Sequence, residues 1–169
     1  ETTEADNKTT KLYLALSVDK DEILLADELK KITEVRFKQI LDKKKYITLN
    51  QGKIHHYSME EVSSIDEQVN LIAKQFPDSL LLLLSLTGNI MKNSGDMFPS
   101  ITILYMSFSA YSPEGQIIWK KTYEAKRLNT KKVSKLNTSE KQISMTKTLI
   151  KGFKEIKKKG IMDELKSSL

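Results

Sequence analysis

ITILYMSFSAYSPEGQIIWKKTYEAKR, residues 101–127, is the stretch that decides the fold of this chain. Apolar and polar residues alternate along both of its ends, which is the period-two pattern of β-strands. Between the two ends lies Ser112-Pro113-Glu114-Gly115, where proline presets the turn and glycine supplies a positive φ. We therefore predict a β-hairpin of two long strands, the second of which ends in a basic run.

Strand and helix patterns on both sides of the hairpin complete an α/β fold. SLLLLLSLTGNIM, residues 79–91, has an unbroken leucine run, which is typical of a strand buried on both faces at the centre of a sheet. The predicted strands span 11–18, 46–50, 79–91, 101–110 and 116–125, and the predicted helices span 23–44, 65–76 and 140–159. Residues 51–64 are polar and predict a loop. The predicted order is β-α-β-α-β-β-β-α, with five strands and three main helices.

The length and the ends of the chain indicate one domain with a short tether. A chain of 169 residues is long enough to bury one core. Residues 1–10, ETTEADNKTT, are polar without an apolar period and predict a flexible N-terminal tether, which leaves 11–169 as a single domain. The longest apolar run, Leu80–Leu84, is far too short to cross a bilayer.

The last predicted helix separates apolar residues from basic ones. Its start has a weak capping box in Ser139 and Gln142, with Thr138 as the alternative cap, and Gly160 ends it. Its apolar stripe consists of Leu149, Ile150, Phe153 and Ile156. Lysines spaced four, three and four residues apart lie nearly opposite that stripe, at Lys147, Lys151, Lys154 and Lys158.

Positive charge is concentrated at the C-terminal end of the chain. Residues 127–169 hold 12 Lys/Arg and 4 Asp/Glu, whereas residues 1–126 hold 16 and 18. This asymmetry indicates an acidic partner, which could be a nucleic acid, an anionic lipid, an acidic polymer or a protein. The alternative is a solvated lysine face that only keeps the chain in solution. The candidate partner-binding residues are Lys131, Lys132, Lys135, Lys147, Lys151, Lys154 and Lys158.

The sequence contains no motif for catalysis or cofactor binding. The absence of cysteine excludes disulfides, thiol catalysis and Cys-based metal sites. His55 and His56 are adjacent, so their side chains point apart, and no carboxylate cluster supports a metal site there. The acidic pairs at 60–61 and 66–67 are explained more simply by a helix start than by acid–base catalysis. We therefore predict a protein that is not an enzyme and holds no metal or cofactor.

A nucleic-acid-binding module is the alternative from another functional class. Such proteins usually combine arginine and exposed aromatic residues on a basic surface. Here the basic segment contains only Arg127, and we expect Tyr123 and Phe153 to lie in the core. Lysine alone gives a diffuse attraction that salt weakens. The pattern therefore disfavours specific recognition of DNA or RNA.

Three segments together carry a resemblance to a known group of proteins. LADELKKITEVRFKQILDKKKYITL, residues 25–49, predicts a helix that leads into a short strand. DEQVNLIAKQFPDSLLLLLSLTGNI, residues 66–90, predicts a helix, a Pro-Asp stop and a central strand. With the hairpin at 101–127, this layout resembles bacterial envelope lipoproteins built like the N-terminal domain of TolB, a group that includes the CsgG, PelC and LpoB-like proteins. The layout covers residues 11–160. This chain departs from the group in two ways, because no lipidated Cys is present in it and its lysine content is high.

The resemblance implies an architecture and a location but no functional residues. It implies a mixed sheet with helices packed on it, in a periplasmic or outer-membrane-anchored protein whose signal sequence has been removed. Such domains act by protein–protein contact in secretion, polysaccharide export or cell-wall synthesis, and they meet the membrane only through an N-terminal lipid anchor. A surface adhesin-type lipoprotein is the neighbouring alternative.

Overall fold

The computed structural model describes residues 10–18, 23–24, 26–41, 44–49, 55–58, 65–95 and 97–168. The elements are β1 (Thr10–Val18), α2 (Asp27–Gln39), β2 (Tyr46–Thr48), β3 (His55–Ser58), α3 (Ile65–Gln75), β4 (Leu80–Lys92), β5 (Ser100–Tyr111), β6 (Ile117–Asn129), the 3-10 helix η1 (Val133–Lys135), α4 (Thr138–Lys159) and α5 (Ile161–Ser167). The predicted α/β class is confirmed, with its five strands and three main helices in the predicted order.

The predictions for two segments differ from the structure. Residues 55–58, expected within a loop, form the additional strand β3, because the open edge of β1 supplies a pairing partner that the local sequence does not reveal. Helix α2 is shorter than predicted, and it begins at Asp27 and ends at Gln39. The predicted tether at 1–10 lies outside the described residues except for Thr10, which already belongs to β1.

The sheet is mixed, and its two edges differ. The strand order is β2-β1-β4-β5-β6, and β3 also pairs with β1. β1 runs parallel to β2, β3 and β4, whereas β4–β5 and β5–β6 are antiparallel. The short strands β2 and β3 pair with the start and the end of β1, so they cover one edge together. The other edge is the 13-residue strand β6.

The predicted hairpin joins β5 to β6. The N–H of Gly115 donates to the Ser112 carbonyl at 2.8 Å, and the N–H of Ser112 donates to the Gln116 carbonyl at 2.7 Å. Gly115 has a φ of 85°, a conformation that glycine adopts without steric cost. This turn therefore closes the hairpin as the sequence predicts.

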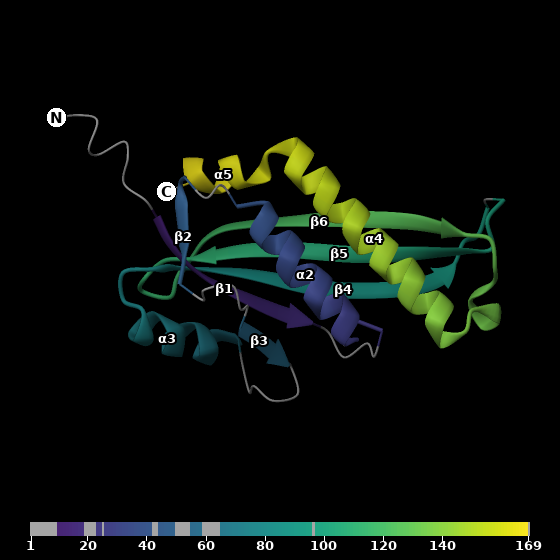
Figure 1. Ribbon diagram of the computed structural model, residues 1–169, viewed down its shortest axis with the longest axis horizontal. Coiled ribbons are helices and arrows are strands. Elements are labelled where there is room, and N and C mark those ends of the chain that lie inside the picture. The colour runs from purple at the N-terminus through teal and green to yellow at the C-terminus, as the bar shows by residue number, and fades with distance from the viewer. Residues whose placement is uncertain are drawn as a thin grey trace.

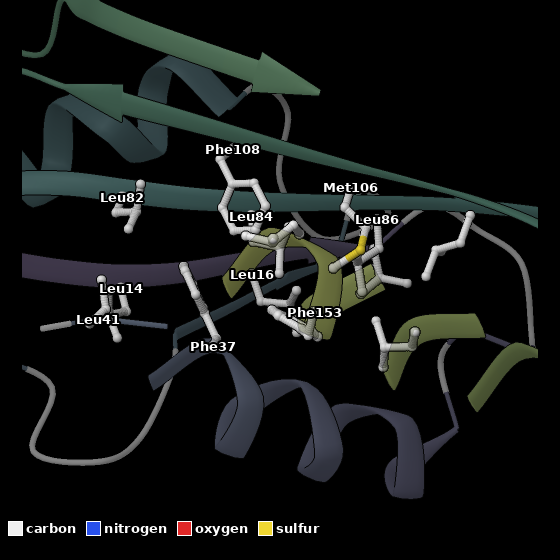
Figure 2. Close-up of a cluster of buried hydrophobic side chains, with 14 of the residues drawn as sticks. Leu14, Leu16, Phe37, Leu41, Leu82, Leu84, Leu86, Met106, Phe108 and Phe153 are labelled. Carbon is white, nitrogen blue, oxygen red and sulfur yellow. The ribbon is translucent and has the colours of Figure 1, made fainter. Parts of the chain in front are cut away.

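Helices α2 and α4 lie across one face of the sheet (Figure 1). The main core lies beneath them and takes every second residue of β1, β4 and β5, including Leu14, Leu82 and Phe108. Figure 2 shows Phe37 of α2 pointing toward the strands, where its ring lies 5.9 Å from that of Phe108. Phe153 of α4 is also buried in this cluster, as predicted.

The opposite face of the sheet is covered by α3. Val69 and Ile72 of α3 pack against Ala15, Leu81 and Leu83. β1 and β4 therefore contribute residues to both faces, which explains their nearly continuous runs of leucine and other apolar residues. Within the described residues, no helix has the length and apolar character needed to span a membrane.

Candidate partner-binding surface

The seven lysines predicted to bind a partner are all exposed. Lys131 and Lys132 follow β6, Lys135 ends η1, and the other four lie on α4. The residues of α4 that face the sheet are Ser144, Met145, Thr148, Leu149, Gly152, Phe153 and Ile156. The lysine stripe lies on the far side of the helix from these residues, as the 3.6-residue period predicts.

Helix α4 runs back alongside β6 in the opposite direction. Near its start, Ser144 donates a hydrogen bond to Asn129 at the end of β6. Near its end, the ammonium group of Lys159 lies 5.9 Å above the ring of Tyr123. Figure 1 shows the helix crossing diagonally over β6 and the strands beside it. The basic helix and the edge strand therefore form one continuous region, which the sequence pattern did not reveal.

One lysine of the stripe contacts the edge strand directly. The ammonium group of Lys151 donates a hydrogen bond to the backbone carbonyl of Lys126 at 3.0 Å. This carbonyl belongs to β6, whose outer side pairs with no other described strand. Lys151 therefore occupies a backbone acceptor on the open edge of the sheet.

β6 adds positive charge of its own to this region. Lys120, Lys121 and Lys126 are exposed, and Arg127 is half-buried. Lys126 lies 3.0 Å from the Glu124 carboxylate, and the hydrogen bond between them raises the pKa of Lys126. The basic region is therefore wider than the seven predicted lysines.

Lys131 is held at the start of α4 rather than standing free. Its ammonium group donates to the Glu140 carboxylate at 2.6 Å. Asn137 is the N-cap of α4, where its side chain accepts from the N–H of Glu140 at 2.8 Å and the two residues form a capping box. The predicted box at Ser139 and the alternative cap at Thr138 are therefore wrong, because α4 already includes both residues.

A cavity of about 230 Å³ lies between the end of β6 and the first turns of α4. Asn129 and Ser144 line it and form a closed ring of hydrogen bonds with the buried Thr102. Arg127 lines the same cavity, and its buried Nε has no hydrogen-bond partner. The cavity thus combines a satisfied polar floor with one guanidinium group that retains an unused donor.

The candidate residues for catalysis or metal binding lie on β3 and α3 or outside the described residues. His55 and His56 belong to β3, and their side chains lie outside the described part of the structure. Asp66 and Glu67 are exposed in the first turn of α3, where carboxylates favour a helix start. The acidic pair at 60–61 lies outside the described residues. Across the described ranges, no group of three or more His, Asp or Glu residues could hold a metal ion.

Comparison with solved structures gives likenesses of fold. The sequence matches no protein-family model and no curated protein. The hypothetical protein CT253 from Chlamydia trachomatis has a similar structure, with 11% identity, coverage of 88% of this chain and 93% of that chain, and a TM-score of 0.52. The chain also resembles a minor lipoprotein from Acinetobacter baumannii, with 15% identity, coverage of 90% and 87%, and a TM-score of 0.45.

A further bacterial lipoprotein shows the same low-identity likeness. Rare lipoprotein B from Shewanella oneidensis is 13% identical, with coverage of 93% of this chain and 99% of that chain and a TM-score of 0.41. At such identities the likeness concerns the fold alone. It assigns neither a partner nor a reaction to this chain.

Proposed function

We propose that this chain is a non-catalytic domain of a bacterial envelope lipoprotein, of the group built like the N-terminal domain of TolB. In this proposal it lies in the periplasm or on the outer membrane, held by an N-terminal lipid. It serves an assembly, secretion or cell-wall machine by binding an acidic protein or polymer of the envelope. The observation that carries the proposal is the exposed lysine stripe of α4 beside the basic edge strand β6.

The arrangement of these lysines supports a docking role in physical terms. Aligned cations on a rigid helix produce a field that attracts an acidic partner and speeds their encounter. This attraction acts between exposed groups, so salt screens it over a distance of about 10 Å at 0.1 M ionic strength. The helix itself is fixed to the main core by Leu149, Phe153 and Ile156. The charges are therefore presented in a constant geometry.

Charge reversal on α4 tests this surface. We expect that replacing its four stripe lysines with glutamate weakens capture of partners from a solubilised envelope extract about tenfold or more. The variants are Lys147→Glu, Lys151→Glu, Lys154→Glu and Lys158→Glu in combination. Capture by the unaltered chain should fall when salt is raised from about 0.05 M to about 0.5 M. Captured proteins are quantified by mass spectrometry.

A matched control separates the surface from net charge. Four exposed lysines on other elements are reversed together, at Lys11, Lys31, Lys44 and Lys74. Both sets change the net charge from +6 to −2. Capture that survives the α4 set, or that falls equally with both sets, would reject the α4 surface.

The nucleic-acid alternative has a separate measurement. Fluorescence anisotropy with mixed-sequence DNA and RNA at physiological salt gives the affinity directly. A lysine surface without readout binds nonspecifically, with dissociation constants of about 10⁻⁴ to 10⁻⁶ M. Submicromolar binding would replace the envelope proposal with a nucleic-acid function.

A further inference from the structure

The two edges of the sheet leave very different amounts of backbone available for pairing. Along β1, the outer edge pairs with β2 over Thr10–Leu12 and with β3 over Ala15–Val18. Along β6, the outer edge has no strand partner among the described residues over 13 residues. A long unpaired edge is a template to which another extended chain can add.

The contact with Lys151 shows which groups of β6 point outward. In an antiparallel ladder, the N–H and C=O of alternate residues face the partner strand, and those of the intervening residues face away. The carbonyl of Lys126 accepts from Lys151, so it points away from β5. The register between β5 and β6 is regular from Trp119 to Asn129. The outward-facing residues are therefore Lys120, Thr122, Glu124, Lys126 and Leu128.

The charge around this edge restricts what can pair with it. On the side that α4 covers, Lys121 and Arg127 lie before and after Tyr123 and Ala125 along β6. On the opposite side, Lys120 and Lys126 outnumber the single carboxylate of Glu124. A second copy of this chain would bring the same cations against these, and like charges across a strand pair are destabilising. An acidic segment would meet opposite charges along both sides.

We propose that an extended acidic segment of the partner binds by adding a strand to the free edge of β6. This inference rests on the proposed function and states how the partner is held. The N–H groups of the segment take the outward carbonyls of β6, including that of Lys126. Lys151 leaves that carbonyl and pairs with a carboxylate of the segment. The lysines of the edge thus repel a second copy while they select an acidic strand.

A defined peptide tests the inference on the folded chain. The probe is a capped peptide of alternating Glu and Thr, about nine residues long to match the usual length of strands. We expect it to bind the unaltered chain and to protect the outward amides of Thr122, Glu124 and Lys126 from hydrogen exchange. The same peptide with Lys in place of Glu should not bind. Absence of binding by the acidic peptide would overturn the inference, as would protection of amides elsewhere.

A pair of substitutions at Thr122 isolates backbone pairing from side-chain effects. Thr122→Pro removes an outward N–H and leaves the β5 ladder intact, as proline on an edge strand allows. Thr122→Ala keeps the N–H, and both variants lose the 2.7 Å contact between the Thr122 and Ser107 hydroxyls. We expect Thr122→Pro to bind the peptide about tenfold more weakly than Thr122→Ala. If Thr122→Pro fails to fold, the exchange pattern of the unaltered chain decides.

The same measurements separate this inference from the proposed function. Equal binding by the two Thr122 variants, with binding lost on charge reversal of α4, would reject strand addition and leave the lysine surface standing. Weaker binding by Thr122→Pro, with no effect of charge reversal, would support strand addition and reject the lysine surface.

Discussion

The two faces of the sheet are covered by unequal amounts of helix. On one face, α2, α4 and α5 bury side chains from β1, β4, β5 and β6 in a single large cluster. On the other face, α3 packs mainly on β1 and β4, and Tyr111 at the end of β5 also contacts this smaller cluster. On that side, Met91 of β4, Tyr105 of β5 and Leu128 of β6 keep 42%, 42% and 40% of their surface exposed. The larger face therefore provides most of the apolar burial.

The difference matters because the helix that completes the large face also carries the lysines. Ser144, Thr148 and Gly152 of α4 are buried together with its apolar residues, so the helix contacts the sheet along much of its length. A surface on such a firmly packed element keeps its geometry better than a surface on a loop. Helix α3 has 11 residues and buries fewer side chains. A binding surface on α3 would therefore keep its geometry less well than one on α4.

The largest expected effect comes from truncating one apolar side chain on each face. Phe108 is fully buried under α2 and α4, and Phe108→Ala should lower the free energy of unfolding by about 3–5 kcal/mol. Ile72 and Phe76 lie on the α3 face. Ile72→Ala or Phe76→Ala should lower the free energy of unfolding by about 2 kcal/mol, because the smaller cluster can collapse around the cavity that is left. Urea unfolding measures both losses, and equal losses would show that the two faces contribute equally.

The core was largely predictable from the sequence because it follows simple periods. Alternation placed Thr102, Leu104, Met106, Phe108 and Ala110 on one face of β5, and all five are buried. The unbroken leucine run predicted the central position of β4, which pairs with β1 and β5. The 3.6-residue period likewise predicted the exposed lysine stripe of α4. Each of these features depends on the local pattern of one element.

The features that the sequence did not predict depend on contacts between distant segments. Strand β3 forms because the edge of β1 offers backbone hydrogen-bond partners to it. The residues at 55–58 are too polar to predict a strand by themselves. The start of α4 has three good N-cap residues in a row, at Asn137, Thr138 and Ser139. Which of them caps the helix depends on the path of the chain before it. The same holds for the position of α4 beside the free edge of β6, which turns separate basic segments into one surface.

A smaller effect should follow from adding one methyl group beneath α4. A Cβ at Gly152 would lie 2.5 Å from the sulfur of Met106 and 3.2 Å from the Cβ of Ala125. Alanine favours a helix by about 1 kcal/mol over glycine, but overpacking a buried contact costs about 1–3 kcal/mol. We therefore expect Gly152→Ala to lower the free energy of unfolding by about 1 kcal/mol, as measured by urea unfolding.

A double-mutant cycle identifies the source of that cost. In a Met106→Ala background the sulfur is gone, so Gly152→Ala should become neutral or stabilising by up to about 1 kcal/mol. An unchanged cost in that background would mean that the close approach to Met106 is not what requires glycine. The result would then weaken the claim that α4 is packed more tightly on its face than α3 is on the other.

The smallest expected effect concerns the start of α4 and depends on pH. Hydrogen bonds from Lys131 and from the backbone N–H of Asn137 lower the pKa of Glu140 below its ordinary value of 4.5. A carboxylate whose pKa is lowered by folding binds fewer protons in the folded state than in the unfolded state. Its contribution to stability is therefore present above pH 4.5 and is lost as the pH falls through the lowered pKa of the folded state.

Two variants test whether Lys131 causes this shift. With Lys131→Gln, the Glu140 carboxylate loses its charged donor, so its NMR titration midpoint should rise toward the ordinary value of 4.5. With Glu140→Gln, the acid-dependent part of the stability that Glu140 supplies should disappear, while the cap from the Asn137 side chain to the backbone of residue 140 remains. A midpoint that does not move in Lys131→Gln would show that the capping box alone holds Glu140. Lys131 would then be free for a partner, and the basic surface would extend without interruption from the end of β6 onto α4.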